Sequence, residues 1–235
     1  MESSGTITSR TTYNEYGQPV SMTDGMGNIA RLVYYSGGDN DGFLKNRITA
    51  WGELDLKSEF QYDKVGNLIA SWPPRAFEAG VTQNDFMVSH QVNELNQTWH
   101  SSHNVEVGTY NALTLVTVDT YNYFDANGNL TNSFREYITD AGVGETNPSG
   151  GNELNPSWFA TEKATSAMAA TWVETSSKYN LLNYAYEHTQ DAVAGSVIEQ
   201  YTSRTIYDSN YNVLQSISPL GNKSRTIYDE RDMVY

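Results

Sequence analysis

Two histidines placed three residues apart are the first candidates for chemistry in this sequence. His100 and His103 lie in the stretch QTWHSSHNVEVGTY. On a helix, this spacing could place both imidazoles where they bind a metal ion. The local sequence is more typical of strand and turn, His90 and His188 are remote in sequence, and the chain has no cysteine to complete a site. We therefore favour surface or stacking histidines over a metal site.

A short acidic and glycine-rich stretch, GGDNDG at Gly37–Gly42, is the second candidate. Asp39 and Asp41, with Asn40 between them, offer the hard oxygen ligands that calcium takes. The twelve-residue EF-hand pattern is absent, however, and the glycine-rich pattern occurs once. An acidic surface turn is the favoured interpretation, because Asp, Asn and Gly are residues that turns use. Calcium at Asp39 and Asp41 stays open as the alternative.

The short patterns that mark common enzymes are absent from the sequence. There is no G-x-S-x-G nucleophile elbow and no G-x-x-x-x-G-K-[ST] phosphate-binding loop. Paired carboxylates could in principle hydrolyse glycosides, but most of the prominent aspartates occupy positions that a backbone turn uses. We therefore predict no enzyme, no catalytic, cofactor-binding or metal-binding residue, and no cofactor.

The composition indicates strands and argues against a nucleic-acid partner. The 17 Tyr, 7 Phe and 5 Trp favour a pleated, half-buried surface. The formal net charge is -14, and no run of Lys and Arg offers the basic surface that phosphates require. No apolar stretch approaches the ~20 residues of a membrane span. The opening MESSGTITSR lacks the basic and apolar segments of a signal peptide.

One hexapeptide is repeated, and it identifies the element on which the fold depends. SRTIYD occurs at Ser203–Asp208 and again at Ser224–Asp229, and SRTTYN at Ser9–Asn14 is a close copy. In each copy an aromatic residue precedes Asp or Asn, and three positions further on a Gly or another turn-like residue is expected. The same pattern follows Tyr62, Phe124 and Tyr179, and a weaker copy follows Val92.

These tetrapeptides predict the tips of β-hairpins. A type I turn favours Asp, Asn or Ser at its first position and Gly at its fourth. Gly adopts the left-handed conformation without steric strain, and Asn tolerates it next best. Such a turn joins two antiparallel strands through a bulge. Asp24–Gly27 and Ser218–Gly221 follow the same rule. The strands between the turns are expected to have roughly 5–6 residues.

Two turns depart from the pattern at the fourth position. Tyr211 stands where Gly is expected, so we predict that Asn210 or Asn212 adopts the left-handed conformation. Asp232 stands at the same position in the last turn and tolerates that conformation less well than Gly. The turn formers on which the interpretation depends are Asn14, Gly17, Asp63, Gly66, Asp125, Gly128, Asp208 and Gly221, together with Tyr13, Tyr62, Tyr207 and Tyr228.

Two stretches interrupt the pattern. No turn signature lies between Pro73 and His90. From 137 to 156 the sequence is rich in Gly, Asn and Ser, which predicts a long loop. A helix of roughly four turns is expected after it, with Asn155 as cap. Trp158, Ala164, Met168 and Trp172 would share one face. This face is expected to pack on the adjacent sheet, with docking to a partner as the alternative.

The repeated arginines and tyrosines suit sheet packing. Arg204, Arg225 and Arg10 recur with the strand, and we expect them to pair with or stack on neighbouring strands. Repeated tyrosines could form an aromatic ladder on one face, since residues two apart share a face. Packing between strands is the favoured role of these tyrosines, and a sugar-binding platform is the alternative.

The turn pattern resembles that of the YD-repeat, or RHS-repeat, family. The resemblance is carried by YDKVGNL at 62–68, FDANGNL at 124–130, TTYNEYGQPVSMTDGMGN at 11–28 and RTIYDSNYNVLQSISPLGN at 204–222. It implies an all-β fold, a repetitive antiparallel β-hairpin ribbon forming part of a curved shell, with one loop or helix insertion. The implied repeats are at about 9–35, 58–72, 90–100, 118–135 and 177–235, with the insertion at about 137–175.

The resemblance also implies a function. In bacterial toxin-complex subunits and polymorphic toxins, such a shell encloses an unfolded or toxic segment, and related repeats occur in animal adhesion receptors. We therefore expect a structural scaffold in a bacterial secreted or cell-surface protein. Its expected partners are further repeats of the same longer polypeptide and an enclosed toxin or cargo segment.

The sequence departs from the bacterial shell proteins in one respect. Their self-cleavage site of the DPxGL kind has no counterpart, since SPLGN at 218–222 is an ordinary repeat turn. The chain begins within a repeat and stops just after a turn, so we expect a segment of a longer protein. Two other functions stay open: an extracellular carbohydrate- or receptor-binding β module for cell-cell contact, and a glycoside hydrolase with two carboxylates across a cleft.

Overall fold

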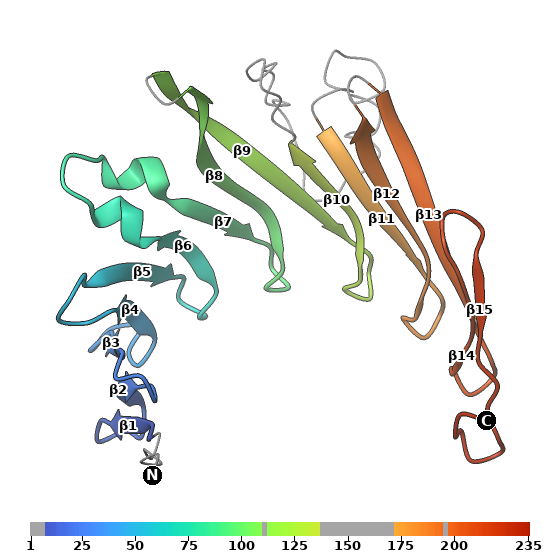
Figure 1. The fold of residues 1–235 in the computed structure, drawn as a ribbon, viewed down its shortest axis with the longest axis horizontal. Helices are drawn as coiled ribbons and strands as arrows, with labels where there is room; N and C mark the ends of the chain where they lie inside the picture. The colour runs from blue at the N-terminus through green and yellow to red at the C-terminus, as the bar shows by residue number, and fades with distance from the viewer. Residues whose placement is uncertain (1–7, 110–111, 137–171, 195–196) are drawn as a thin grey trace, which may run out of the picture. The chain divides into compact units, whose positions relative to one another are not determined.

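The protein is all-β throughout the residues that the structure describes. The structure is a computed structural model and describes residues 8–109, 112–136, 172–194 and 197–235 (Figure 1). These ranges contain fifteen β-strands and two short 3-10 helices. The chain divides into two compact units, unit 1 (Met1–Val92 with Ser102–Val105) and unit 2 (Asn93–Ser101 with Glu106–Tyr235). None of the helices in the described ranges has the length and apolar composition to cross a membrane.

Unit 1 is a series of short antiparallel strands, each paired with the next one in the chain. Their order in the sheet follows their order in the sequence. The strands are β1 (Arg10–Tyr13), β2 (Pro19–Thr23), β3 (Ile29–Tyr34), β4 (Leu44–Thr49), β5 (Leu56–Tyr62), β6 (Leu68–Trp72) and β7 (Val88–Val92).

Unit 2 is also built of antiparallel strands in chain order, and several of them are longer. Four of them have 10 to 13 residues, so the predicted length of 5–6 residues is wrong for these strands. The strands are β8 (Thr98–Thr109, of which Ser102–Val105 belongs to unit 1), β9 (Ala112–Phe124), β10 (Leu130–Glu136), β11 (Trp172–Tyr179), β12 (Ala185–Ala194), β13 (Val197–Tyr207), β14 (Val213–Ile217) and β15 (Lys223–Arg225).

The predicted hairpin tips are confirmed. The tetrapeptides that join β1 to β2, β2 to β3, β5 to β6, β9 to β10, β11 to β12, β13 to β14 and β14 to β15 each connect an antiparallel pair. The pairing of β5 with β6 shifts between Gln61 and Tyr62, and equivalent shifts precede the turns of β1–β2, β11–β12 and β13–β14. This shift is the bulge that a type I turn followed by a left-handed residue produces. The turn chemistry alone therefore fixes where these strands reverse.

The prediction for the Tyr211 turn is wrong. Tyr211 itself adopts the left-handed conformation, with a φ of 67°, and neither neighbouring Asn has a positive φ. Its ring stacks on Tyr184, with centroids 4.8 Å apart and planes 12° apart. This contact stabilises a conformation that is unfavourable for a bulky residue. Asp232 also adopts it, with a φ of 60°.

The stretch without a turn signature contains the two 3-10 helices, η1 (Pro74–Phe77) and η2 (Gln83–Phe86). The predicted insertion and its helix fall mostly outside the described residues. Where they are described, they are wrong: Trp172 begins β11, where it lies opposite Glu136, and residues up to 175 belong to the same strand. The apolar spacing that we assigned to a helix therefore ends in a strand.

A cluster of buried aromatic residues lies in unit 2. Tyr121 and Tyr123 of β9, Phe134 of β10 and Trp172 of β11 are buried together, with Trp99 packed against them. Phe134 is fully buried, and its ring lies edge-on to Tyr123 at 5.8 Å. Aromatic pairs across neighbouring strands stabilise a sheet. The predicted packing role of tyrosines is confirmed for these two tyrosines.

Candidate functional site: the edge formed by the hairpin turns

One carboxylate organises each turn, and Asp63 shows how. Its Oδ1 accepts hydrogen bonds from the backbone N–H groups of Val65 (3.0 Å) and Asn67 (2.8 Å). Its Oδ2 accepts one from the Nδ2 of Asn67 (2.8 Å). The backbone N–H of Gly66 donates to the Asp63 carbonyl (3.3 Å). The side chain therefore replaces the ladder partners that a reversing strand loses.

The same arrangement recurs along the chain. We number each turn from one to five, beginning with the residue that accepts these bonds, so that in the turn above Asp63 is position one and Asn67 position five. In each case position one accepts from the backbone N–H of positions three and five. The other turns of this kind begin at Asn14, Asp24, Asn93, Asp125, Asn180, Asp208 and Asp229. Ser218 accepts only from position five, Asn222.

These hydrogen bonds change the acidity of the turn aspartates. The side-chain amide of the position-five asparagine lowers the pKa of Asp24, Asp63 and Asp125, and backbone N–H donors lower it further. Each donor favours the ionised form, which accepts more hydrogen bonds than the protonated acid. The asparagine at position five is thus a structural part of the turn, a role that the sequence analysis did not predict.

Position five also reaches the following hairpin at the same edge, and unit 1 shows one such contact. The Nε2 of Gln18 donates to the carbonyl of Gly42 (2.8 Å), in the loop that joins β3 to β4. Phe43, the residue after that glycine, packs over Gly66, at position four of the following turn. A Cβ at Gly66 would lie 2.9 Å from the Phe43 Cζ. These contacts join three successive hairpins at their turns.

In unit 2, position five of one turn contacts position four of the next turn along the same edge. The Nε2 of Gln97 donates to the carbonyl of Gly128 (3.3 Å), and the Nδ2 of Asn129 donates to the Oδ1 of Asn183 (2.8 Å). The turns that join β9 to β10 and β11 to β12 lie at the same ends of their hairpins (Figure 1). Position five is therefore a connector as well as part of its own turn.

Further along unit 2, two more connectors follow the same rule. Tyr184 at position five stacks on Tyr211 at position four, so an aromatic pair replaces the amide bond. The Nδ2 of Asn212 donates to the Oδ1 of Asp232 (2.7 Å). We use the term turn edge for the turns that are joined by these contacts, together with the contacts themselves, in each unit.

A tyrosine at the end of a strand adds a second connection at several of the hairpins. The hydroxyl of Tyr207 donates to the carbonyl of Ala185 (2.7 Å), the residue after position five of the preceding turn. The equivalent carbonyl accepts from the hydroxyl in three more cases: Tyr34 to Pro19 (2.8 Å), Tyr179 to Leu130 (3.0 Å) and Tyr228 to Val213 (3.2 Å).

These hydroxyl contacts explain why the pattern prefers tyrosine. Phe124 and Val92 can pack at this position but cannot donate. Sequence reasoning predicted packing and missed the hydrogen bond, because the accepting carbonyl lies from 15 to 49 residues away. Tyr13 differs from the others: it is 62% exposed and its hydroxyl has no partner among the described residues. The carbonyl of Tyr62 accepts instead, from the Nδ2 of Asn40 (3.1 Å).

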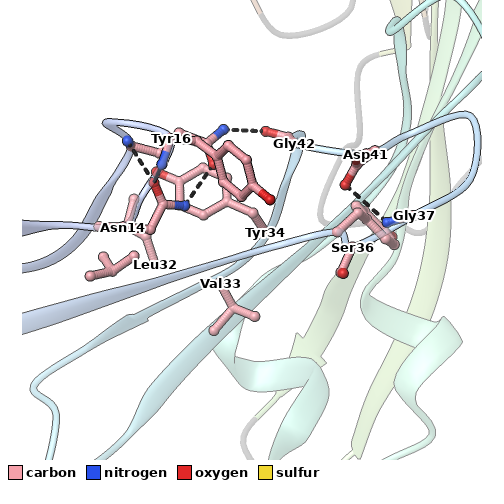
Figure 2. Close-up of a pocket in the computed structure, with 12 residues that line it drawn as sticks. Asn14, Tyr16, Leu32, Val33, Tyr34, Ser36, Gly37, Asp41 and Gly42 are labelled. Atoms are coloured by element: carbon pink, nitrogen blue, oxygen red, sulfur yellow. Dashed lines mark hydrogen bonds between the residues drawn. The ribbon is translucent and has the colours of Figure 1, made fainter.

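The candidate calcium residues do not converge. Asp41 uses its Oδ1 to accept from the backbone N–H of Gly37 (2.9 Å), and Asp39 lies 3.7 Å from the Nζ of Lys64. Figure 2 shows Asp41 turned to Gly37 at one end of a pocket and Tyr16 at the other end. Within the described ranges no three acidic or histidine side chains are arranged to hold a metal ion. The loop geometry matches the acidic turn that we favoured.

The pocket of Figure 2 has a volume of about 580 Å³ and lies at the turn edge of unit 1. Several of its polar groups already have partners within the protein. The side chain of Asn14 bonds its own turn, Gln18 bonds Gly42, and the hydroxyl of Tyr34 bonds Pro19. The pocket is thus a by-product of the connection between two hairpins.

The histidine pair of the sequence lies on strand β8 and not on a helix. The Nε2 of His100 lies 2.9 Å from the Oδ1 of Asp119, and its ring stacks on Tyr121 at 4.5 Å. Glu136 lies beside Asp119, and burial raises the pKa of Glu136, with the charge of Asp119 raising it further. The expected role of a surface or stacking histidine is confirmed for His100 in its stacking form, with 14% of its side chain exposed. His100 and Asp119 are 19 positions apart, so no local sequence pattern predicts their contact.

The repeated arginine pairs with a neighbouring strand in one of its three copies. The Nε of Arg204 donates to the Oε2 of Glu187 (2.8 Å), directly opposite on β12. Arg10 and Arg225 form no ion pair with any residue that the structure describes. The predicted pairing is confirmed for Arg204.

Comparisons with known proteins return distant structural matches. No family model matches the chain, and no curated protein matches its sequence. Similar solved structures include crystal structures of TcdB2-TccC3-TEV (13% identity, TM-score 0.30) and TcdB2-TccC3-Cdc42 (14%, 0.25). A Photorhabdus luminescens Tc holotoxin pore with a substitution in TccC3 is also similar (14%, 0.24). These matches cover 94–95% of this chain and 14–15% of the others.

Proposed function

We propose that this chain is a structural scaffold, a segment of a β-sheet wall built from YD-type hairpins. Its work is mechanical: paired backbones make the wall, and the turn edge holds successive hairpins in register. The single observation that carries the proposal is the contact between position five of one turn and position four of the next turn along the same edge, which recurs through unit 2. Each copy of this contact joins one hairpin to the next without a ligand. A contact that is repeated in this way therefore supports assembly of the sheet.

The wall is proposed to form part of a shell around a toxin or cargo segment of a bacterial secreted or cell-surface protein. Further repeats of the same longer polypeptide would complete it. This step rests on the resemblance of the turn motif to RHS repeats. In support, the motif residues have the structural roles that a repeated building unit requires: one residue turns the chain and a second one joins it to its neighbour.

The test uses the protein as its gene encodes it, including any segments that flank these residues. The product is treated with a nonspecific protease, and the surviving segments are identified by mass spectrometry. Enclosure predicts that a segment outside the β-repeats survives at protease concentrations that degrade the same segment expressed alone. Equal rates of degradation in the two samples would contradict enclosure.

A further inference from the structure

Two carboxylates are buried next to each other in unit 2. Asp119 of β9 is 6% exposed and Glu136 of β10 is 9% exposed. Tyr121 lies directly opposite Phe134, and each carboxylate is two residues away from this pair toward the same end of the hairpin, so both point to the same face. The Oε2 of Glu136 accepts a hydrogen bond from the backbone N–H of Asp119 (3.4 Å). The two acidic groups therefore lie close together with little access to water.

The surroundings of this pair are mostly aromatic. Trp172 of β11 lies directly opposite Glu136 and is 1% exposed. The ring of Tyr121 is buried as well, and burial, followed by the charge of Asp119, raises the pKa of Tyr121 to about 12. Tyr121 is therefore neutral at physiological pH and adds no charge to the cluster.

One group in contact with the pair can carry a positive charge, the imidazole of His100. Its Nε2 lies 2.9 Å from the Oδ1 of Asp119. Its ring stacks on Tyr121, with centroids 4.5 Å apart and planes 13° apart. These contacts hold the imidazole beside one of the two carboxylates.

On the described residues of β8 to β11, no further cation faces the pair. Arg135 is next to Glu136 in sequence but points to the opposite face, because successive residues of a strand alternate. Lys178 lies six residues beyond Trp172 and pairs with Glu187. The other titratable side chains of β8, β9 and β11 are acidic or phenolic, or lie further along their strand: His103, Glu106, Tyr123, Glu174 and Tyr179.

At neutral pH the cluster therefore contains an uncompensated negative charge. Even with a protonated His100, two carboxylates face one imidazolium. Burial raises the pKa of Glu136, and the charge of Asp119 raises it as well, although the hydrogen bond from the Asp119 N–H acts in the opposite direction. A low local dielectric and a neighbouring like charge both favour the protonated form of a carboxyl group.

We propose that Asp119 and Glu136 form a proton-binding site that takes up one proton in mild acid and thereby stabilises unit 2. A protonated Glu136 keeps a carbonyl oxygen that accepts from the Asp119 N–H, and it gains an O–H donor beside the Asp119 carboxylate. Proton uptake thus removes one buried charge and keeps the contact between β9 and β10. This proposal is independent of the scaffold function.

The expected pH dependence is opposite in sign to that of the turn aspartates, whose pKa values are lowered. A carboxyl group with a raised folded pKa destabilises the fold in full above that pKa. The destabilisation decreases as pH falls and is absent below the unfolded pKa, about 4.3 for Glu. The stability of unit 2 should therefore increase as the pH falls from about 8 to about 5.

The first test is urea unfolding of the full chain at about pH 8 and about pH 5, followed by tryptophan fluorescence. For the wild-type protein, we expect a midpoint higher by about 0.5 M urea at the lower pH, which corresponds to about a tenfold change in the unfolding equilibrium. E136Q keeps an acceptor for the Asp119 N–H and removes the charge, so at least half of this difference should disappear. An equal pH dependence in E136Q and the wild-type protein would overturn the proposal.

E94Q is the matched control, because Glu94 is an exposed glutamate of the same unit. It should keep the pH dependence of the wild-type protein. If E94Q lost as much of this dependence as E136Q, the effect would be one of net charge and the proposal would be wrong.

A second measurement does not depend on the folding of a variant. In carbon-13 NMR of the wild-type protein with labelled glutamate, one side-chain carboxyl resonance should titrate clearly above the usual Glu pKa of about 4.3. Its absence from the spectrum of E136Q assigns it to Glu136. A spectrum in which every glutamate titrates in the usual range would overturn the proposal. Neither measurement bears on the turn edge.

Discussion

At the scale of single residues, Gly66 is a position of the turn edge that has no room for a side chain. It has a φ of +95°, and a Cβ there would lie 2.9 Å from the ring of Phe43. We expect Gly66→Ala to lower the free energy of unfolding by about 2–3 kcal/mol, from left-handed strain and from displacement of the ring. Urea unfolding followed by far-UV circular dichroism measures the change.

Gly17→Ala is the control for this prediction. Gly17 also has a positive φ, +78°, but no atom lies within 4 Å of a Cβ placed there. It should show the conformational strain alone, about 1 kcal/mol. If the two variants were equally destabilised, the contact of Phe43 with the next turn would have no energetic role.

The hydroxyl of Tyr207 provides a second test at this scale. Tyr207→Phe removes the donor to the carbonyl of Ala185 and keeps the ring. We expect a loss of about 0.5–1 kcal/mol in the free energy of unfolding, the usual net value of such a bond. Tyr13→Phe is the matched control, because the Tyr13 hydroxyl has no partner among the described residues. A loss of the same size in both variants would contradict the connecting role.

The turn aspartates predict how stability depends on pH. The pKa of Asp63 is lower in the folded chain, mainly because the amide of Asn67 donates to it. A lowered folded pKa gives stability that is fully present above the unfolded pKa, about 3.9, and is lost as pH falls through the folded pKa. We expect the free energy of unfolding to decline below about pH 4–5 for this reason.

Asp63→Asn separates this residue from the others that titrate. Asparagine already begins three of these turns, at Asn14, Asn93 and Asn180, so the variant should keep the turn while removing its charge. The difference between the wild-type protein and the variant should diminish from pH 6 to pH 3. A difference that stays constant over this range would show that the carboxylate does not contribute in its ionised form.

At the scale of elements, the connectors can be measured as pairwise interactions. The Nδ2 of Asn129 donates to the Oδ1 of Asn183, 54 residues away. In a double-mutant cycle with Asn129→Ala and Asn183→Gly, we expect a coupling energy of about 0.5–1 kcal/mol. Glycine is chosen because Asn183 has a φ of 65°. The loss of the bond from Asn129 to Asp125 cancels in the cycle.

The turn of each hairpin could be predicted from the sequence, whereas the contact between hairpins could not. Asp63 bonds residues two and four positions further on, so its partners are set by local chemistry. Tyr211 shows the limit of that chemistry. Its left-handed conformation is unfavourable locally and is stabilised by Tyr184, on a different hairpin. Position five meets position four of the next turn only once the intervening strands have paired.

Buried side chains set a second limit on prediction. His100 and Asp119 meet because the facing strands β8 and β9 bring them together, and Trp172 is buried in a strand although its spacing from earlier apolar residues suited a helix. Periodicity over a Gly- and Ala-rich stretch cannot tell these elements apart without the neighbouring strands. The register of the long strands was equally hidden, because it depends on pairing that the turn motif does not encode.

At the scale of the whole molecule, the contacts that hold each unit together join elements that follow one another in the chain. Within each unit, every strand pairs with the next strand in the chain, and the turn edge repeats this order through side chains. A chain of such contacts is stabilised step by step, as in other repeat proteins. A scaffold of this kind can extend by adding hairpins, each of which requires only its neighbour.

Cross-linking at the turn edge of unit 2 tests the central claim most directly. The chain contains no cysteine, so a pair can be introduced without background. Asn129→Cys with Asn183→Cys joins position five to position four of the next turn, whereas Asn129→Cys with Asn212→Cys pairs it with a turn one hairpin further on. With a short bifunctional thiol reagent, we expect rapid intramolecular cross-linking in the first variant and little in the second. Similar rates in both variants, or a faster rate in the second, would contradict the account.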